Sequence, residues 1–532
     1  MDPARLTQFG AVELARSIAA GDVSAREVVD AHIARIEEVD GHLNAVVIRR
    51  FETARDEADA ADAARRSGAT LGPLHGVPVT IKDQFHVAGL PTTFGTPRLR
   101  EHVARDDGPT VAAWRRAGAI VLGKGNVPQV LSAVETDNDV FGRTNNPWDV
   151  ERTPGGSSGG DAAIVAAGGV PLALGGDLGG SLRLPAAWCG IATLTPTSRR
   201  FLTDAIPGTR TAYGVEGIVA VPGPLARSTA DVAAALRVMA DDAVARARGM
   251  QPPVPWADPA DVDVSRLRVA MIPDIAGWSP CPAARRALND AAAALRASGA
   301  DVETWDSAPD LERAVQLGIG VFTAAGIDPY RQMLGGDRAH ALLKGDMSMA
   351  NVPNVARAPL TRLLRSLGQE RAARIVPSTY RRSAAGLLDL LGDRLEFEAA
   401  FLAALDAGGF DALLLPPVPH PAPRHRSTPE MVDANAGVIA FNLLGMPSGV
   451  VPVTRVRDGE ETDRAPSRDG AVRAVRASEI GSAGLPVGVM VAARHWREDV
   501  VLAVMGAIEA ASEPPTLATV APNGAFAAVP GR

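Results

Sequence analysis

The first fifty residues alternate apolar and polar positions with the period of an α-helix. Residues 11–50 contain two such segments, and Ser24 and Glu27 open the second at the spacing of a capping box, in which the two side chains bind free N–H groups of the first turn. The apolar stripe of this second segment is Val28, Val29, Ile33 and Ile36. The pattern predicts two amphipathic helices that pack against the rest of the protein.

Further along, short β-branched runs alternate with helical stretches. The run LHGVPVTIKD (74–83) stops at Lys82 and Asp83, as a buried strand does when it reaches the edge of its sheet. Residues 108–126 combine a helical stretch with a short apolar run, and Val170 to Leu174 form another short strand before a glycine-rich turn. This alternation predicts an α/β fold with Lys82 at a strand terminus.

The same alternation returns after a proline-rich connector at 250–265. It is followed by a strand–helix–strand pattern, and later strand-like runs occupy 410–418, 448–456 and 485–493. A charged excursion separates the last two runs. Residues 330–405 are largely helical, and within them the amphipathic part 340–370 fits either a lid or surface packing.

Composition removes several classes of function. The chain has 532 residues with 46% hydrophobic residues, a net charge of −7 and two cysteines, Cys189 and Cys281. The chain has no excess of positive charge that would attract nucleic acid. The two cysteines form neither a disulfide framework nor a zinc motif. No window offers ~18 uninterrupted apolar residues, and the N-terminus lacks the pattern of a signal peptide. We therefore expect a cytoplasmic protein with no nucleic-acid partner and no membrane-spanning segment.

Lysine is rare in this chain. Of 54 basic residues only Lys82, Lys124 and Lys344 are lysines, so positive charge is otherwise carried by arginine. A retained lysine can mark a position that needs an amine able to lose its proton, which a guanidinium cannot do. Retention by chance at a surface site is the alternative.

Two glycine-rich turns carry serines. The first, GGSSGG (155–160), satisfies GxSxG, but no hydrophobic strand precedes it as a nucleophile elbow requires, and Asp161 stands where a P-loop needs lysine. The second turn contains Gly179, Gly180 and Ser181 and could aim successive N–H groups at one point, as an oxyanion hole does. Each turn alone could be purely structural.

Together these segments resemble the amidase signature hydrolases. The stretch 155–197 is similar to the family signature throughout, and the flanking blocks HGVPVTIKD (75–83) and NVPQ…FGRTNNPWD (126–149) occur in the family's order. The resemblance implies one α/β/α domain over residues 1–532 with a large mixed central sheet. Within it would lie the N-terminal helices 11–50, a signature core at about 70–235 and a C-terminal α/β part at 266–515, and the connector would not be a domain boundary.

The resemblance also implies roles for individual residues. Lys82 looks like the catalytic lysine, Ser157 like the bridging serine after a cis peptide bond at Gly156-Ser157, and Ser181 like the nucleophile. The other implied site residues are Leu178, Gly179 and Gly180 for the oxyanion hole, Leu131 along the substrate cleft, and Ser158, Asp177 and Arg183 behind the turn. The family requires no metal and no organic cofactor.

Two departures from the family pattern affect the surroundings of the site. Gly175-Gly176-Asp177 replaces the usual GTD, and Thr193–Thr197 replaces the usual GLKPT, so that its lysine is lost. Neither removes a catalytic atom, but the second changes the local charge network. We expect Lys124 to be structural.

The resemblance is greatest to the fatty acid amide hydrolase branch, from the segments FNLLGMPSGVVPVTRV and GSAGLPVGVMVAARHWRED. It implies an amidohydrolase that cleaves the carbon–nitrogen bond of a largely apolar small-molecule amide through a Ser-cisSer-Lys triad and an acyl-enzyme. Hydrolysis of a carbamate or an ester by the same triad, the A-type subunit of a glutaminyl-tRNA amidotransferase, and a non-catalytic binding protein remain alternatives. A conventional esterase would need a histidine triad that the sequence does not display. The resemblance also allows a homodimer.

Overall fold

The computed structural model describes most of the chain. The described residues are 2–203, 217–242, 245, 252–512, 517–520 and 526–528. Parts of three predicted segments lie outside this description: 204–216 of the signature core, 250 and 251 of the connector, and 513–515 of the C-terminal part.

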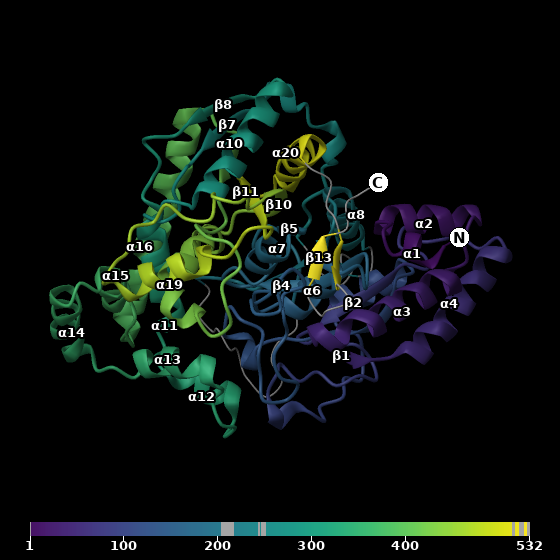
Figure 1. Cartoon of the computed structure of the whole chain (residues 1–532), viewed down its shortest axis with the longest axis horizontal. Helices are drawn as coiled ribbons and strands as arrows, with labels where there is room; N and C mark the ends of the chain where they lie inside the picture. Colours follow the sequence, from purple (N-terminus) through teal and green to yellow (C-terminus); the bar gives the residue numbers. More distant parts are fainter. Residues whose placement is uncertain are drawn as a thin grey trace.

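One eleven-stranded sheet runs through the whole molecule (Figure 1). Its strand order is β1-β3-β2-β4-β6-β5-β10-β11-β9-β7-β8, so strands from both sides of the proline-rich connector share the sheet. The strands are β1 Val46–Arg49, β2 Pro78–Lys82, β3 Ile120–Gly125, β4 Leu172–Asp177, β5 Ala192–Thr195, β6 Val221–Ala226, β7 Arg268–Met271, β8 Asp301–Thr304, β9 Ala412–Leu415, β10 Ser448–Arg455 and β11 Pro486–Ala493. A separate two-stranded sheet joins β12 (Ala518–Val520) and β13 (Phe526–Ala528).

The sheet is mixed, as the sequence predicts. β2 is parallel to both β3 and β4, while β4 is antiparallel to β6 and β10 is antiparallel to β5 and β11. Because β3, β2 and β4 are parallel neighbours, their carboxyl ends meet at the same edge of the sheet. Lys82 and Asp177 are the last residues of β2 and β4, so both lie at this edge.

Helices pack against the sheet and against one another. α6 (Gly159–Ala166) lies beside α7 (Arg183–Cys189), and α20 (Glu498–Ala511) contacts both α8 (Thr229–Ala240) and α10 (Pro282–Ala297). The longer helices are α2 Ala11–Ala20, α3 Ala25–Leu43, α4 Phe51–Arg66, α5 Pro109–Arg116, α6 Gly159–Ala166, α8 Thr229–Ala240, α10 Pro282–Ala297, α11 Leu311–Thr323, α13 Ala341–Ala350, α14 Asn354–Ser366, α16 Ala384–Gly408, α19 Gly470–Glu479 and α20 Glu498–Ala511. The shorter ones are α1 Pro3–Leu6, α7 Arg183–Cys189, α12 Asp328–Leu334, α15 Glu370–Ile375, α17 Val432–Asn435 and α18 Ile439–Leu444. Among the described residues, no helix combines the length and the hydropathy needed to cross a bilayer.

The predicted N-terminal helices are confirmed with one correction. The capping box of Ser24 and Glu27 opens α3, and the apolar stripe of this helix is buried. Residues 46–49, however, form the edge strand β1, antiparallel to β3, where the sequence predicts only helix. Val46, Val47 and Ile48 are β-branched and follow the left-handed cap residue Asn44, so the chain turns out of the helix and extends.

The strand before the serine turn is longer than predicted. β4 continues through Gly175 and Gly176 to Asp177, all of them buried. A Cβ at Gly175 would lie 2.6 Å from Leu182 Cδ2 and 2.9 Å from Ser158 Oγ. Glycine is therefore needed here for close packing within a strand, and the turn itself begins only at Leu178.

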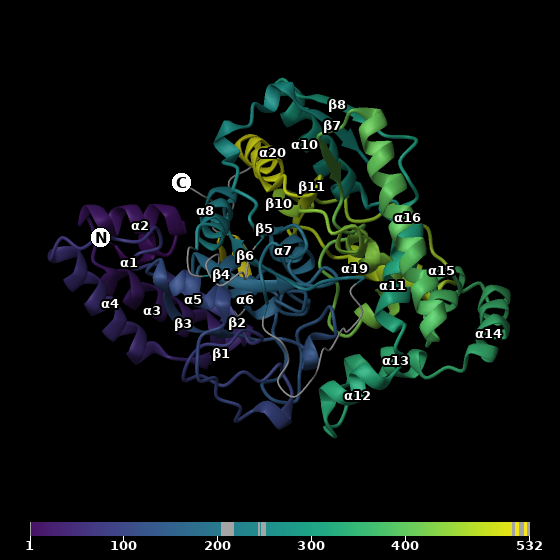
Figure 2. The ribbon, with the colours of Figure 1, turned by 180° about the vertical axis from the view of Figure 1, so that it is seen from behind.

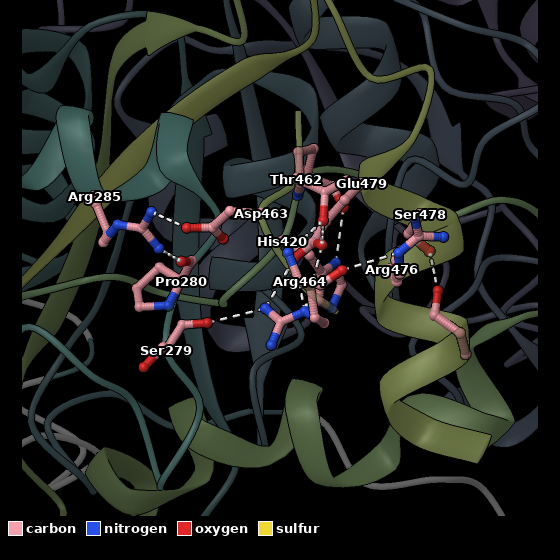
Figure 3. A network of polar contacts seen from close by, with 12 residues as sticks. Ser279, Pro280, Arg285, His420, Thr462, Asp463, Arg464, Arg476, Ser478 and Glu479 are labelled. Carbon is pink, nitrogen blue, oxygen red and sulfur yellow. Dashed lines mark hydrogen bonds and ion pairs between the residues drawn. The ribbon is translucent and has the colours of Figure 1, made fainter. Parts of the chain in front are cut away.

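Arg464 of the charged excursion between β10 and β11 forms an ion pair with the buried Glu479 of α19 and contacts the segment before α10. Figure 3 shows Arg464 between Glu479 and the main chain of Ser279, with Nη2 donating to Glu479 Oε1 and to Ser279 O, both at 2.9 Å. Glu479 is fully buried, and Arg476 donates to the Arg464 carbonyl. These contacts hold α19 and the excursion against the segment before α10.

A buried arginine joins the two halves of the chain. Arg152 is fully buried and donates to four main-chain carbonyls at 2.6–3.2 Å, and its Nε donates to Asp149 at 3.0 Å. The four carbonyls belong to Ala422, Ser478, Ile480 and Gly481. One guanidinium thus satisfies buried acceptors that are more than 250 residues away in sequence.

We expect Arg152→Leu to lower the free energy of unfolding by at least about 3 kcal/mol, because it leaves several buried carbonyls without donors. Urea denaturation followed by circular dichroism measures this loss. Arg237→Leu is the control, since Arg237 is an exposed partner of Asp258 and such pairs contribute at most about 1 kcal/mol. Equal losses in the two variants would contradict the role of Arg152.

Candidate active site

Lys82 is buried at the end of β2 and is bound by the first serine turn. Its Nζ lies 2.8 Å from Ser157 Oγ and donates to the carbonyl of Gly176 at 3.0 Å. The side chain is about 1% exposed. Burial strips water from the ammonium and lowers the pKa of Lys82 to about 7, although the carboxylates of Asp161 and Asp177 act in the opposite direction. Near neutral pH this amine is therefore able to accept a proton.

The two serine turns lie against each other. The Gly156-Ser157 peptide bond is cis, as the resemblance predicts. Ser158 donates its main-chain N–H to Ser181 O at 3.2 Å and its hydroxyl to Gly176 O at 3.3 Å. Ser157 is buried whereas Ser181 is partly exposed. The structure thus brings Lys82, Ser157 and the turn of Ser181 together, with Ser181 on the accessible side.

Asp177 organises the second serine turn. Its Oδ1 accepts the N–H of Gly180 at 2.8 Å and its Oδ2 accepts the N–H of Leu182 at 3.0 Å. The Gly180 N–H predicted for the oxyanion hole is therefore engaged by this carboxylate. No hydrogen bond among the described residues uses the N–H of Gly179 or Ser181.

Arg183 and two residues from the C-terminal half hold Asp177 in place. Burial acts to raise the pKa of the Asp177 carboxyl, but the charge and hydrogen bonds of Arg183 outweigh it and hold that pKa far below its usual range. Arg183 Nη2 is 3.0 Å from Asp177 Oδ1, and Asn442 Nδ2 donates to the same oxygen at 2.9 Å. Arg183 also donates to Asn442 Oδ1, to Ser448 Oγ and to a main-chain carbonyl in the same region.

Sequence reasoning missed Asn442 and Ser448. Both stand in the run FNLLGMPSGVVPV, which contributed to the resemblance without any role for individual residues. The departure at Thr193–Thr197 lies next to the same carboxylate. Thr195, at the position of the lost lysine, has its hydroxyl 3.4 Å from Asp177 Oδ2, and Arg183 supplies the positive charge there.

Apolar side chains border the serine turn. A Cβ at Gly179 would lie 3.2 Å from Phe322 Cζ and 3.6 Å from Ile439 Cγ1, and Leu178 packs against the same core. Gly180 has a φ of +110°, where only glycine is unstrained. The accessible side of the turn is therefore largely apolar.

Leu131 lies in a loop that supports a second apolar cluster. Val130 and Leu131 have positive φ values of 49° and 60°. The cluster combines residues of this loop and of 94–99 with residues of α12 and α13: Phe94, Leu99, Val130, Met333, Leu334 and Leu343, with Leu131 and Met347 against it. The start of the segment 340–370 thus packs on the Leu131 loop, while α14 projects at the edge of the molecule (Figure 2).

Lys124 is the other buried lysine and serves the structure, as predicted. Its Nζ lies 2.8 Å from Asp83 Oδ1 and donates to Pro91 O and Thr92 Oγ1. Lys124 therefore has a carboxylate partner, and Lys82 has a serine. In the part of the chain that the structure describes, no three His, Cys, Asp or Glu side chains gather as metal ligands would.

The mixed sheet thus places a buried lysine beside two serine turns. The family model described as Amidase matches residues 27–502. The chain therefore belongs to the amidase family, and it is an amide-hydrolysing enzyme. The family resemblance predicted from the sequence is confirmed.

Individual relatives agree with this assignment. The chain is 30% identical over 515 residues to fatty-acid amide hydrolase 1 of Sus scrofa, covering 96% of this chain and 86% of that protein. It is 40% identical over 324 residues to indoleacetamide hydrolase of Bradyrhizobium diazoefficiens, covering 59% of each chain. It is 33% identical over 518 residues to the A-type subunit of glutamyl-tRNA(Gln) amidotransferase from Deinococcus radiodurans, covering 94% of this chain and 96% of that one.

A solved structure of fatty acid amide hydrolase has the same fold. Its TM-score is 0.81 at 24% identity, over 96% of this chain and 86% of the other. The predicted α/β fold with a large mixed sheet is confirmed.

We expect Asn442→Ala to lower kcat for amide hydrolysis by roughly tenfold to a hundredfold, because it removes one of the groups that fix the serine turn through Asp177. The pH dependence should stay unchanged, since Asn442 does not titrate. Steady-state kinetics with an aryl amide measures both. Asn435→Ala is the control, because this buried asparagine of the neighbouring α17 contacts His420 and not Asp177. An Asn442→Ala rate within twofold of the control would contradict the positioning role.

Proposed function

We propose that this enzyme hydrolyses the carbon–nitrogen bond of a largely apolar small-molecule amide, with Ser181 as nucleophile, Ser157 as proton relay and Lys82 as base. The observation that carries the proposal is the contact of 2.8 Å between Lys82 Nζ and Ser157 Oγ at a fully buried lysine. A lysine that is neutral near pH 7 has a lone pair with which to take the Ser157 proton.

The proposed proton path runs from the partly exposed Ser181 through the buried Ser157 to the buried Lys82. Ser181 attacks the substrate carbonyl while its proton passes to Ser157 and the Ser157 proton passes to Lys82. When the tetrahedral intermediate collapses, a proton returns through Ser157 to the leaving nitrogen, which departs as an amine and leaves an acyl group on Ser181. Water then repeats the path in place of Ser181, and the acid is released.

The developing oxyanion needs donors that are not already used. Because the Gly180 N–H binds Asp177, we assign the oxyanion hole to the N–H groups of Leu178, Gly179 and Ser181 and give Gly180 the role of anchoring the turn. Arg183 and Ser158 support this geometry from behind, through Asp177 and Gly176.

The apolar surroundings support an apolar acyl group. Phe322 and Ile439 border Gly179, and Leu131 lies in the loop that we place along the cleft. The relatives named fatty-acid amide hydrolase and indoleacetamide hydrolase act, by their names, on amides with apolar acyl parts. Carbamates and esters with similar groups would undergo the same acyl transfer.

The similarity to the amidotransferase subunit of Deinococcus radiodurans supports a second candidate function. In that role the chain would release ammonia from glutamine for a partner protein. The apolar border of the turn favours the first candidate, since the amide side chain of glutamine is polar. Assaying the chain alone against glutamine and against a fatty or aryl acyl amide separates the two.

We expect Ser181→Ala and Lys82→Met to lower kcat/KM by at least about a thousandfold, because each removes a group that acts in the transition state. A fluorophosphonate probe should add to Ser181 of the wild type, and the addition should be lost in Lys82→Met. Peptide mapping by mass spectrometry identifies the modified serine. An adduct on Ser157 or Ser158 would overturn the assignment of the nucleophile, and an unlabelled wild type would contradict an activated serine nucleophile.

The pH dependence should follow Lys82. Since the pKa of Lys82 is lowered to about 7, the lysine is charged and unable to accept a proton below this pH. We therefore expect kcat/KM to rise with pH through about 7 and then to level off. A rate that is independent of pH between 5.5 and 8.5, with chemistry rate-limiting, would contradict Lys82 as the base.

A further inference from the structure

Asp161 is a buried carboxyl that the proposed reaction does not use. It is the third residue of α6 and fully buried, and among the residues that the structure describes neither of its oxygens has a hydrogen-bond partner of normal geometry. Nearly every buried polar group in a native protein is paired, so an orphaned carboxyl requires a specific reason.

The carboxyl of Asp161 lies against the strand next to Lys82. A Cβ at Gly125 would be only 2.3 Å from Asp161 Oδ2, so the carboxyl presses on the last residue of β3. Gly125 is the register partner of Lys82 in the parallel pair of β3 and β2. Neighbouring strands are about 4.8 Å apart, so the carboxyl lies at the same edge of the sheet as the lysine. Of the charges that act on Lys82, that of Asp161 is the strongest.

The other charged groups around α6 already have partners of their own. On the adjoining strands Lys124 pairs with Asp83, and Asp177 at the end of β4 pairs with Arg183 of α7. Further groups on elements that pack against α6 include His32, Arg35 and Asp40 of α3, Arg49 of β1 and Arg227 after β6.

These remaining groups do not compete for Asp161. Arg49 pairs with Asp40, Arg35 with Glu38, and Arg227 donates to main-chain carbonyls. Burial lowers the pKa of His32 to about 4, so its imidazole is neutral. Among the described residues, neither Lys82 nor Asp161 therefore forms an ion pair with another charged group, and the two lie at the same edge of the sheet.

We propose that Asp161 is a positioning residue for the base: its carboxyl and the Lys82 amine hold a single proton between them, and this coupling sets the pH at which the lysine can act. The proposal rests on the assignment of Lys82 as base.

Burial brings the pKa values of Lys82 and Asp161 close to each other. It lowers the pKa of Lys82 to about 7 and raises that of Asp161 to about 7, so the neutral pair and the ion pair have similar free energies. The hydroxyl of Thr80, two residues before Lys82 on the same face of β2, is also buried without a partner of normal geometry. It acts on the Asp161 carboxyl against burial and lowers its pKa, so it favours the ionised form of the pair.

The coupling has a kinetic consequence. When Lys82 takes the proton of Ser157 it becomes a buried ammonium. An ionised Asp161 stabilises that ammonium, whereas an amide in its place does not. Asp161 therefore makes Lys82 a stronger base than burial alone would leave it.

The pH profile of Asp161→Asn tests the proposal. Removing the negative charge lowers the pKa of Lys82, so the acidic limb of kcat/KM should move to lower pH by about one unit, a tenfold change in the protonation equilibrium. The plateau rate should fall several-fold because the base is weaker. Asp231→Asn is the matched control: Asp231 is a buried carboxyl with one unpartnered oxygen on α8, and its Oδ1 accepts the Val12 N–H at 2.8 Å, which asparagine can also do. An Asp161→Asn profile that superimposes on the wild type would overturn the proposal.

An infrared titration separates failure of this proposal from failure of the proposed function, because it needs no turnover. The wild type should show a carboxylic acid that ionises near neutral pH and that is missing in Asp161→Asn. Lys82→Met should displace this ionisation to higher pH, since the ammonium that favours the carboxylate is gone. A wild-type enzyme without amidase activity would refute the proposed function while this titration still decides on the pair. Absence of a titrating acid that depends on Asp161 would overturn the coupling.

Discussion

The exclusion of water from one amine at the end of β2 is the constraint on which the active site depends. Every other buried cation discussed above is compensated by a carboxylate or by a set of carbonyls: Lys124 by Asp83, Arg183 by Asp177, and Arg152 by four peptide oxygens. Lys82 instead contacts a hydroxyl and a single carbonyl. A cation in such surroundings loses more hydration than it regains, and the balance shifts toward the neutral amine. The same sheet edge therefore holds two buried lysines with different partners, a carboxylate for Lys124 and a serine hydroxyl for Lys82.

The turn that carries Ser181 is fixed from the other half of the chain. Asp177 holds two N–H groups of the turn, Arg183 holds Asp177, and Asn442 binds both of them. This network of contacts is buried, and at its centre Asp177 and Arg183 form an ion pair. Removing either of these two side chains would leave the other as an unpaired buried charge. The glycines give the turn its shape, whereas the aspartate and its partners keep it in one position.

Local pattern was sufficient to predict most of the elements around the site. The run ending at Lys82 predicts a strand with the lysine at its tip, and the capping box and apolar stripe predict α3; both are confirmed. The edge strand β1 was not predicted, because the three β-branched residues at 46–48 directly follow a strong helical pattern. The roles of the site residues came from an ordered set of motifs. The sequence motifs assigned no role to Asn442 or Asp161. Asn442 contacts Asp177 across 265 residues of sequence, and the distinguishing feature of Asp161 is a buried carboxyl without a hydrogen-bond partner of normal geometry among the described residues.

The strand order of the sheet has a consequence for the timing of synthesis. Lys82, Ser157 and Ser181 all lie in the first 181 residues, so a nascent chain carries these three side chains before residues 438–448 have been synthesised. The neighbour of β5 in the sheet is β10, and the residues that bind Arg183 from outside the serine turn lie at 438–448. The emerging N-terminal portion thus carries the serine turn without the C-terminal residues that hold Asp177 and Arg183 in place. We therefore expect the serine turn to take its final geometry only when β10 has docked beside β5.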